Sequence, residues 1–234
     1  MKILKLAFNP KVLERKPVES YDICAQKVIK AVQKNTVVDK PSFSRVLYLL
    51  GDSFESTGNR TQMNNKSKWF AEKLVSLKSN DLAGIVYSLL IKLNYDSPKL
   101  REEFATRALA NAVRIKDPIH IMARANDLKE VYKITAHGSD KHLKVLYQEK
   151  RALNDIINNY DKLQKSHRTI SRDLKPLEGY QFKLAAIKVE IAELLLKKDP
   201  TLAKKELLES QEMYTILGGG KNSEKINQLL QNLG

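Results

Sequence analysis

Cysteine is almost absent from this sequence: Cys24 is the single one among 234 residues. An internal disulfide is therefore excluded, and nothing points to an oxidising compartment. Cys24 lies in an apolar helical pattern, which predicts a buried, unreactive thiol. No apolar stretch reaches the roughly 18 residues that span a bilayer, and the N-terminal residues lack the apolar core of a secretion signal. We therefore expect a cytoplasmic protein.

Turn-forming residues are also scarce, with 9 glycines and 7 prolines. A β-protein of this length normally needs more of both, so the scarcity favours long helices. The hydrophobic fraction of 42% and the charged fraction of 29% are typical of a soluble globular protein and exclude a wholly disordered chain.

Catalytic and metal-binding motifs are missing too. The four histidines are scattered; His137 and His142 flank the turn at Gly138, and we expect them on different elements without a metal. The glycines at 218–220 follow a helical pattern and lack the Lys-Ser/Thr signature of a phosphate loop, so they indicate a helix stop. We expect no enzyme activity, no cofactor and no bound metal.

Positive charge is the feature present in excess: 41 Lys and Arg face 27 Asp and Glu, a formal net charge of +14. Residues 1–117 hold 21 basic and 12 acidic residues, and residues 118–234 hold 20 and 15. The excess is spread along the chain without a long run of like charges. A solvated, lysine-rich helical surface explains such a pattern, and so does an acidic partner.

Apolar residues recur at three- and four-residue spacing through most of the chain, which predicts an all-α protein of about ten helices and no sheet. Ser97-Pro98, Asp117-Pro118 and Asp199-Pro200 indicate helix starts. We expect an extended arm over residues 1–17, a long polar loop over residues 58–66, and one continuous helix over residues 140–163. A polar connector follows from His167 to Leu174. Trp69, at helical spacing from other apolar residues, is expected in the core.

Small residues at fixed spacing carry a resemblance to a known family. Ala105, Leu109 and Ala112 follow a small–bulky–small pattern, which Ala203, Leu207 and Ser210 repeat. With the turn residues around them, these positions resemble the tetratricopeptide repeat over about residues 81–234, although no unit reproduces the full pattern and the period varies. The resemblance implies antiparallel helical hairpins stacked as an α-solenoid. Residues 18–80 would then be N-terminal helices that cap the repeat region of residues 81–234.

A repeat of this kind implies a binding groove, because the first helix of each hairpin lines the concave face. By the resemblance, four residues point into that groove: Asn126, Glu130, Lys133 and Lys188. We therefore expect a scaffold or adaptor that binds a protein or peptide. If the groove is basic, an acidic peptide is its natural ligand. The sequence does not distinguish a passive adaptor from a peptide sensor that regulates an enzyme or transcription factor.

The alternative is a basic helical protein that binds nucleic acid, which the net charge favours. Against it, aromatic residues make up 7% of the chain and are placed mostly for packing, which leaves few platforms for base stacking. No recognition-helix motif is evident either.

Overall fold

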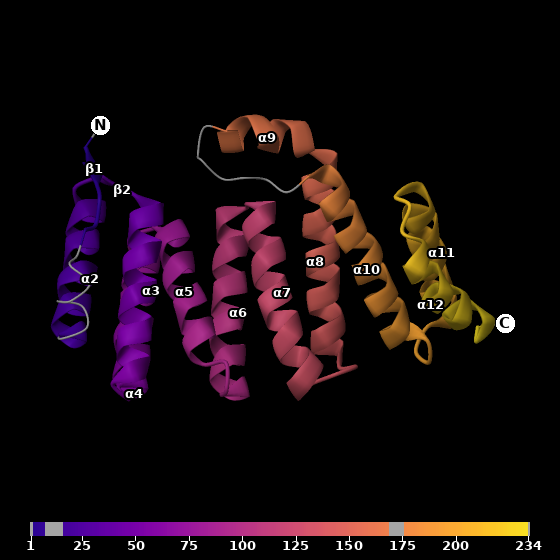
Figure 1. Ribbon diagram of the computed structural model, residues 1–234, viewed down its shortest axis with the longest axis horizontal. Coiled ribbons are helices and arrows are strands. Elements are labelled where there is room, and N and C mark those ends of the chain that lie inside the picture. The colour runs from indigo at the N-terminus through magenta and orange to yellow at the C-terminus, as the bar shows by residue number, and fades with distance from the viewer. Residues whose placement is uncertain (1, 8–15, 169–175, 234) are drawn as a thin grey trace. The chain divides into compact units, whose positions relative to one another are not determined.

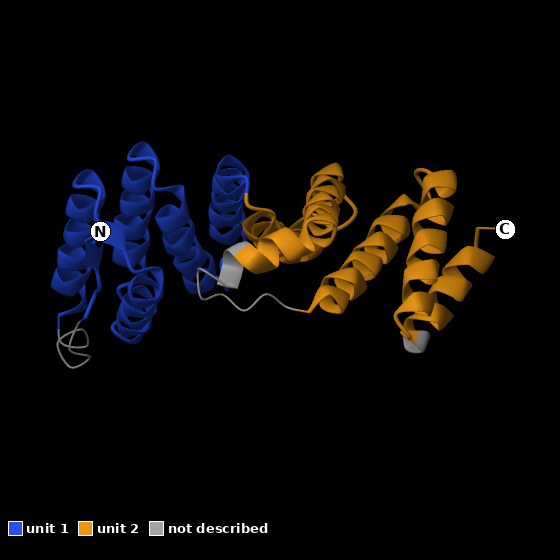
Figure 2. Ribbon diagram, turned by 90° about the horizontal axis from the view of Figure 1, so that it is seen from above, with its two compact units in different colours: residues 1–116 blue, residues 117–234 orange. Residues whose placement is uncertain are grey.

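The computed structural model describes residues 2–7, 16–168 and 176–233, and over these residues the chain is all-α. It divides into two compact units, residues 1–116 and residues 117–234, which are called unit 1 and unit 2 (Figure 2). In the described part of the chain, no helix is long and apolar enough to cross a membrane.

Unit 1 consists of five helices and a short strand pair within its described residues (Figure 1). In chain order the elements are β1 (Ile3–Leu4), α2 (Pro17–Gln33), β2 (Val37–Val38), α3 (Lys40–Ser56), α4 (Arg60–Ser76), α5 (Asn80–Leu93) and α6 (Pro98–Ile115). Short connectors force α4, α5 and α6 to pack as successive antiparallel neighbours.

Unit 2 consists of six helices within its described residues. They are α7 (Pro118–Thr135), α8 (Asp140–Asn158), α9 (Tyr160–Arg168), α10 (Leu177–Leu195), α11 (Pro200–Ile216) and α12 (Gly220–Gln231). The pairs α7–α8 and α10–α11 are helical hairpins, and α8 packs on α10 to join them. The expected class of stacked helical hairpins is therefore found within each unit.

The helix starts follow the signals in the sequence. Pro98, Pro118 and Pro200 each occupy the first turn of a helix, where the missing backbone N–H costs nothing. The Asp117 carboxylate accepts a hydrogen bond from the Ile119 N–H at 2.9 Å and so caps α7. Asp199 caps α11 in the same way. The three predicted starts are confirmed.

The core of unit 1 is built around aromatic rings. Phe70 makes edge-to-face contacts with Tyr21 and Phe43, at centroid distances of 6.1 and 5.9 Å. Tyr21 contacts Phe54 in the same geometry. Such pairs add a preferred orientation to the burial of apolar area, so these rings fix how α2, α3 and α4 pack. Cys24 is buried beside them, and burial raises the pKa of its thiol to about 12, as expected for an unreactive cysteine.

Small residues set the packing of unit 2. Ala203 and Ser210 of α11 are fully buried, and the Ser210 hydroxyl donates a hydrogen bond to the Ala185 carbonyl of α10 at 2.8 Å. The absence of bulk at these positions lets the two helices approach closely. Ala105 and Ala112 are buried in the same manner in unit 1. The small–bulky–small positions therefore do lie at helix interfaces, and their assignment to the tetratricopeptide family stays a prediction.

The polar stretch at residues 58–66 is not a long loop, because α4 begins at Arg60. Its polar residues contain no breaker after Gly58, and Met63 and Ser67 give the helix a buried side. Asn64 and the buried Asn94 exchange amide hydrogen bonds at 2.8 and 2.9 Å, which satisfies polar groups between α4 and α5. Trp69 lies outside the buried side of α4, with 54% of its area exposed, so its expected place in the core is wrong.

Two further expectations differ from the structure. β1 and β2 form a parallel pair, whereas no sheet was expected, since two-residue strands are too short to show alternation. The helix expected over residues 140–163 breaks at Asn159, whose side chain donates to the Asp155 carbonyl and ends α8. The helix α9 takes up His167 of the expected connector, and residues 169–174 lie outside the described residues. The boundary expected at residue 81 falls in the first turn of α5, and the expected division into residues 18–80 and 81–234 stays a prediction.

Candidate functional site

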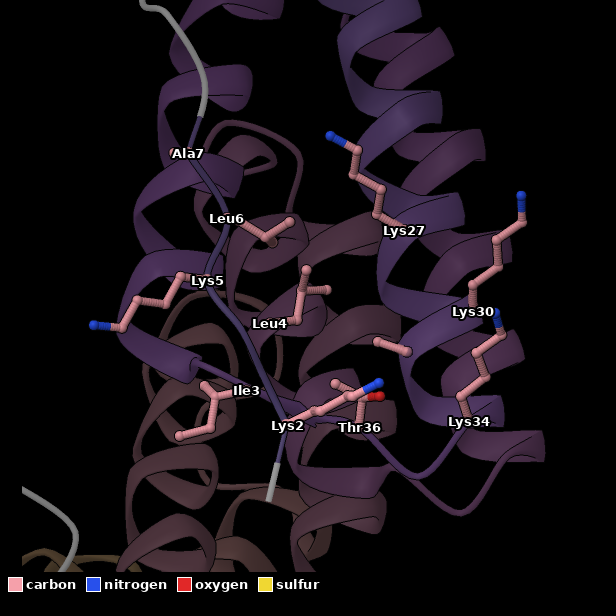
Figure 3. A pocket seen from close by; sticks show the side chains of 11 residues that line it. Lys2, Ile3, Leu4, Lys5, Leu6, Ala7, Lys27, Lys30, Lys34 and Thr36 are labelled. Atoms are coloured by element: carbon pink, nitrogen blue, oxygen red, sulfur yellow. The ribbon is translucent and has the colours of Figure 1, made fainter.

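A groove of about 630 Å³ runs between the N-terminal arm, residues 2–7, and the surface of α2 (Figure 3). We call it the basic groove. The residues that line it are Lys2, Ile3, Leu4, Lys5, Leu6 and Ala7 from the arm, and Lys27, Lys30, Ala31, Lys34 and Thr36 from α2 and the turn after it.

Helical spacing places three lysines on one wall of the basic groove. Lys27, Lys30 and Lys34 are three and four residues apart, so they lie on one face of α2 and at its end. Asn35 then adopts a left-handed conformation with φ 51°, which asparagine tolerates well, and the chain turns back into β2. This turn brings β2 beside the arm.

The arm is held to the unit by backbone hydrogen bonds. The N–H of Val37 donates to the Lys2 carbonyl at 3.1 Å, and the N–H of Asp39 donates to the Leu4 carbonyl at 2.9 Å. Further along, the Leu6 N–H donates to the Ser42 hydroxyl at 3.1 Å. Leu6 is buried, so the arm covers apolar surface that would otherwise be open to water.

No carboxylate lines the basic groove among the described residues. The acidic side chains of α2 pair elsewhere: Glu19 with Lys16, and Asp22 with Lys66 at 2.6 Å. The nearby Asp39 caps α3, and its hydrogen bonds from Ser42 lower the pKa of its carboxyl. The groove therefore combines an apolar floor, from Leu4, Leu6 and Ala31, with a rim of lysines, and no carboxylate is among its described lining residues.

The sequence contains two separate patterns that belong to this site, but it does not show that they lie next to each other. Lysines alternate with apolar residues at positions 2–6, and three lysines share a helical face in α2. The arm was expected to pack along the first helices, but nothing in its own pattern shows which helix face it meets. The strand pairing between residues far apart in the sequence supplies that information.

Lys188, expected on an open binding face, is buried in unit 2. Its ammonium forms ion pairs with Glu206, at 3.4 Å, and with Glu209, both of α11. Burial alone would lower the pKa of Lys188, but the hydrogen bond and charge of these glutamates raise it. The expectation that Lys188 is free to contact a partner is therefore wrong.

Glu130 and Lys133 lie together on α7, as expected, and Lys133 is exposed. The Lys133 ammonium lies 3.1 Å from Glu130 and 3.4 Å from Glu190 of α10. Burial alone would lower the pKa of Lys133, but these two carboxylates raise it. Asn126 is half-buried two turns earlier on the same helix. Whether Asn126, Glu130 and Lys133 contact a partner stays a prediction.

Lys133 also lines a second cavity, of about 590 Å³, which we call the polar pocket. Its residues come from α7, α8, α10, α12 and the turn after α7: Lys133, His137, His142, Glu190, Glu193, Leu194 and Lys225. The charges of the two lysines and two glutamates cancel in pairs. Lys225 lies 2.6 Å from Glu193, and Lys133 lies 3.4 Å from Glu190. The polar pocket therefore has no excess charge to attract an acidic ligand.

His137 and His142 lie on different elements, as expected, but their rings meet, with centroids 5.6 Å apart. His142 is buried, and neither of its ring nitrogens has a hydrogen-bond partner among the described residues. Burial, together with the charge of His137, lowers the pKa of His142. No group of three or more metal-ligating side chains is found in the described part of the chain.

A buried ionic cluster adjoins the polar pocket at Glu190. Glu149 of α8 is completely buried, 3.3 Å from the ammonium of Lys129 and 2.8 Å from that of Lys183. Lys129 is itself buried and also lies 3.5 Å from Glu190. The contacts of Glu149 are ion pairs without hydrogen-bond geometry. A buried charge is costly without its counter-charge. These ion pairs therefore require α7, α8 and α10 to stay packed together.

Comparisons with known proteins give no family. No family model matches the sequence, and no curated protein matches it. Among solved structures, the chain is similar to the crystal structure of BtubC (BKLC) from P. vanneervenii, with a TM-score of 0.44 and 12% identity over 97% of this chain and 89% of that chain. A likeness at this level assigns neither a family nor a function.

Proposed function

We propose that this chain is a protein-interaction module that binds an acidic, partly apolar segment of a partner in the basic groove. The observation that carries the proposal is the combination of an apolar floor with lysines on both walls and no carboxylate among the described lining residues. Figure 3 shows Lys2 on the arm side and Lys27, Lys30 and Lys34 on the α2 side of this gap.

The chemistry of the groove favours a polypeptide. Carboxylates form short charge-assisted hydrogen bonds with ammonium groups, and the apolar floor rewards aliphatic side chains placed between them. A cavity of about 630 Å³ is large enough for several side chains. An acidic partner would also be steered toward unit 1, which carries 21 basic and 11 acidic residues.

The face that the tetratricopeptide resemblance implies is a weaker candidate for an acidic ligand. There, Lys188 is buried and Lys133 is already paired with two carboxylates. A partner would have to displace those pairs before it gained new ones. In the basic groove, by contrast, no carboxylate is among the described lining residues.

Nucleic acid remains the competing partner because of the net charge, and the groove itself argues against it. None of its described lining residues is aromatic, so they offer no surface on which a base could stack. Binding to nucleic acid would therefore rest on phosphate contacts alone and would fall steeply with rising salt.

Fluorescence anisotropy with a labelled ten-residue peptide of alternating Glu and Val tests the proposal. We expect saturable binding that Lys30→Glu with Lys34→Glu weakens by about tenfold or more, because two attractive charges become repulsive. The matched control is Lys73→Glu with Lys78→Glu, which makes the same charge change at and beyond the end of α4. It should weaken binding less than about threefold.

Two competitor ligands complete the design: a single-stranded oligonucleotide with the same number of charges and phosphatidylserine vesicles. Stronger binding of either competitor would overturn the proposal. Equal weakening by the groove variant and its control would also overturn it, because binding would then follow net charge and not the groove.

A further inference from the structure

We infer that the partner segment binds in extended conformation, as a strand added to the free edge of β1. This inference rests on the proposed function, because it specifies how the acidic segment occupies the basic groove. It begins from the hydrogen bonds that the arm already makes.

One edge of the arm is occupied by β2 and α3. The carbonyls of Lys2 and Leu4 accept hydrogen bonds from Val37 and Asp39, and the Leu6 N–H donates to Ser42. In an extended chain, the backbone groups of alternate residues point to opposite edges. The N–H and C=O groups of Ile3 and Lys5 therefore point away from β2.

No described residue donates to or accepts from the other edge of β1, the free edge, and this edge borders the basic groove. Figure 3 shows Leu4 and Leu6 turned toward α2, and Ile3 and Lys5 turned the other way. Ile3 and Lys5 nevertheless line the groove, so they contribute mainly their backbone. Neither residue of β2 is among the lining residues, which places β2 on the opposite edge.

A free strand edge is a template for pairing with another chain, and proteins use such edges to bind peptides. Main-chain hydrogen bonds to Ile3 and Lys5 would supply affinity, while the groove would select side chains. Glutamate side chains on the face of the added strand that is turned toward α2 would cover Leu4 and Leu6 with their methylene groups, and their carboxylates would reach the lysines of α2. Apolar side chains on the opposite face would lie on the side of Ile3, which is 56% exposed. The partner is therefore an extended segment of about six residues that alternates apolar and acidic side chains.

Backbone N-methylation of the Glu–Val peptide tests this binding mode. One version carries N-methyl groups on the valines and the other on the glutamates, so each version blocks the N–H groups of one edge. Strand addition predicts that one version loses about thirtyfold or more in affinity while the other stays within about threefold of the parent. Equal behaviour of the two versions would overturn strand addition.

A protein variant provides the complementary test. Ile3→Pro removes an N–H that β2 does not use, and proline is tolerated on the free edge of a strand. We expect this variant to keep the far-UV circular dichroism of the parent and lose binding by about tenfold, whereas Ile3→Ala keeps the N–H and binds within about threefold of the parent. Failure of the unmodified peptide to bind would instead overturn the proposed function.

Discussion

The two units handle charge in opposite ways. Unit 1 carries 21 basic and 11 acidic residues and builds its core from aromatic rings, so its excess charge stays at the surface. Unit 2 carries 20 basic and 16 acidic residues and buries several of them, including Glu149 and Lys188. Unit 2 thus uses part of its charge in helix packing, whereas the described charged side chains of unit 1 lie outside its core.

The two units thus differ in how they use lysine, which is buried at some positions of unit 2 and at no described position of unit 1. A buried lysine needs its counter-charge to offset the loss of hydration, and it is then unavailable for recognition. An exposed lysine contributes little to stability, because water and salt screen its interactions. The net charge of the whole chain therefore says less about binding than the placement of a few lysines does.

Phe70→Ala should have the largest effect on stability, because it removes the ring that contacts both Tyr21 and Phe43. We expect a loss of about 4 kcal/mol in the free energy of unfolding of unit 1. Urea denaturation followed by Trp69 fluorescence measures it within that unit. A loss below about 1 kcal/mol would show that the aromatic cluster does not hold unit 1 together.

Glu149→Leu should be the next most damaging change, and it acts in unit 2. Lys129 would lose its buried partner, and we expect unfolding to be about 3 kcal/mol easier by circular dichroism. The double variant Lys129→Met with Glu149→Leu removes both charges and should recover most of the loss. If the double variant is as unstable as the single one, the cost comes from shape and not from charge.

Asp117→Asn should have a moderate, pH-dependent effect through the cap of α7. Burial alone would raise the pKa of Asp117, but His120 and the backbone N–H groups of Ile119 and His120 lower it from 3.8 to about 2. Since the folded pKa lies below the ordinary value, the ionised carboxylate stabilises the fold above pH 3.8, and this contribution disappears as the pH falls through about 2.

We therefore expect Asp117→Asn to cost about 1 kcal/mol at pH 7 and less at pH 3. Urea midpoints at the two pH values measure the change, with Asp199→Asn as a control cap on α11. A cost that grows toward low pH would contradict the assigned direction of the pKa shift.

Trp69→Ser should have the smallest effect, although it lies next to Phe70 in the sequence. Because 54% of Trp69 is exposed, we expect a change in stability of about 0.5 kcal/mol or less, measured by thermal unfolding with circular dichroism. A loss comparable to that of Phe70→Ala would place Trp69 in the core, as the sequence had predicted.

Local signals in the sequence were sufficient for most of the fold. The Asp-Pro and Ser-Pro pairs marked helix starts, and the spacing of apolar residues marked helix faces, because both depend on neighbours within one or two turns. The polar start of α4 was missed because part of its support comes from Asn94, which follows α5 and is distant in the sequence.

The candidate site could not be assembled from the sequence for the same reason. The lysine face of α2 is visible in the sequence, but the groove exists only because β2 brings the arm beside that helix. Lys188 fits the expected pattern of a groove residue equally well, and only the packing of α10 on α11 shows that glutamates enclose it.

Hydrogen–deuterium exchange of the full chain, with and without the Glu–Val peptide, tests the central claim most directly. The peptide should slow exchange in residues 2–7 and in the adjoining parts of α2 and β2, because it shields the basic groove, and it should leave α7 to α11 unchanged. Protection confined to α7, α8 and α10, with none in the arm, would contradict the account and return the binding site to the face that the repeat resemblance implies.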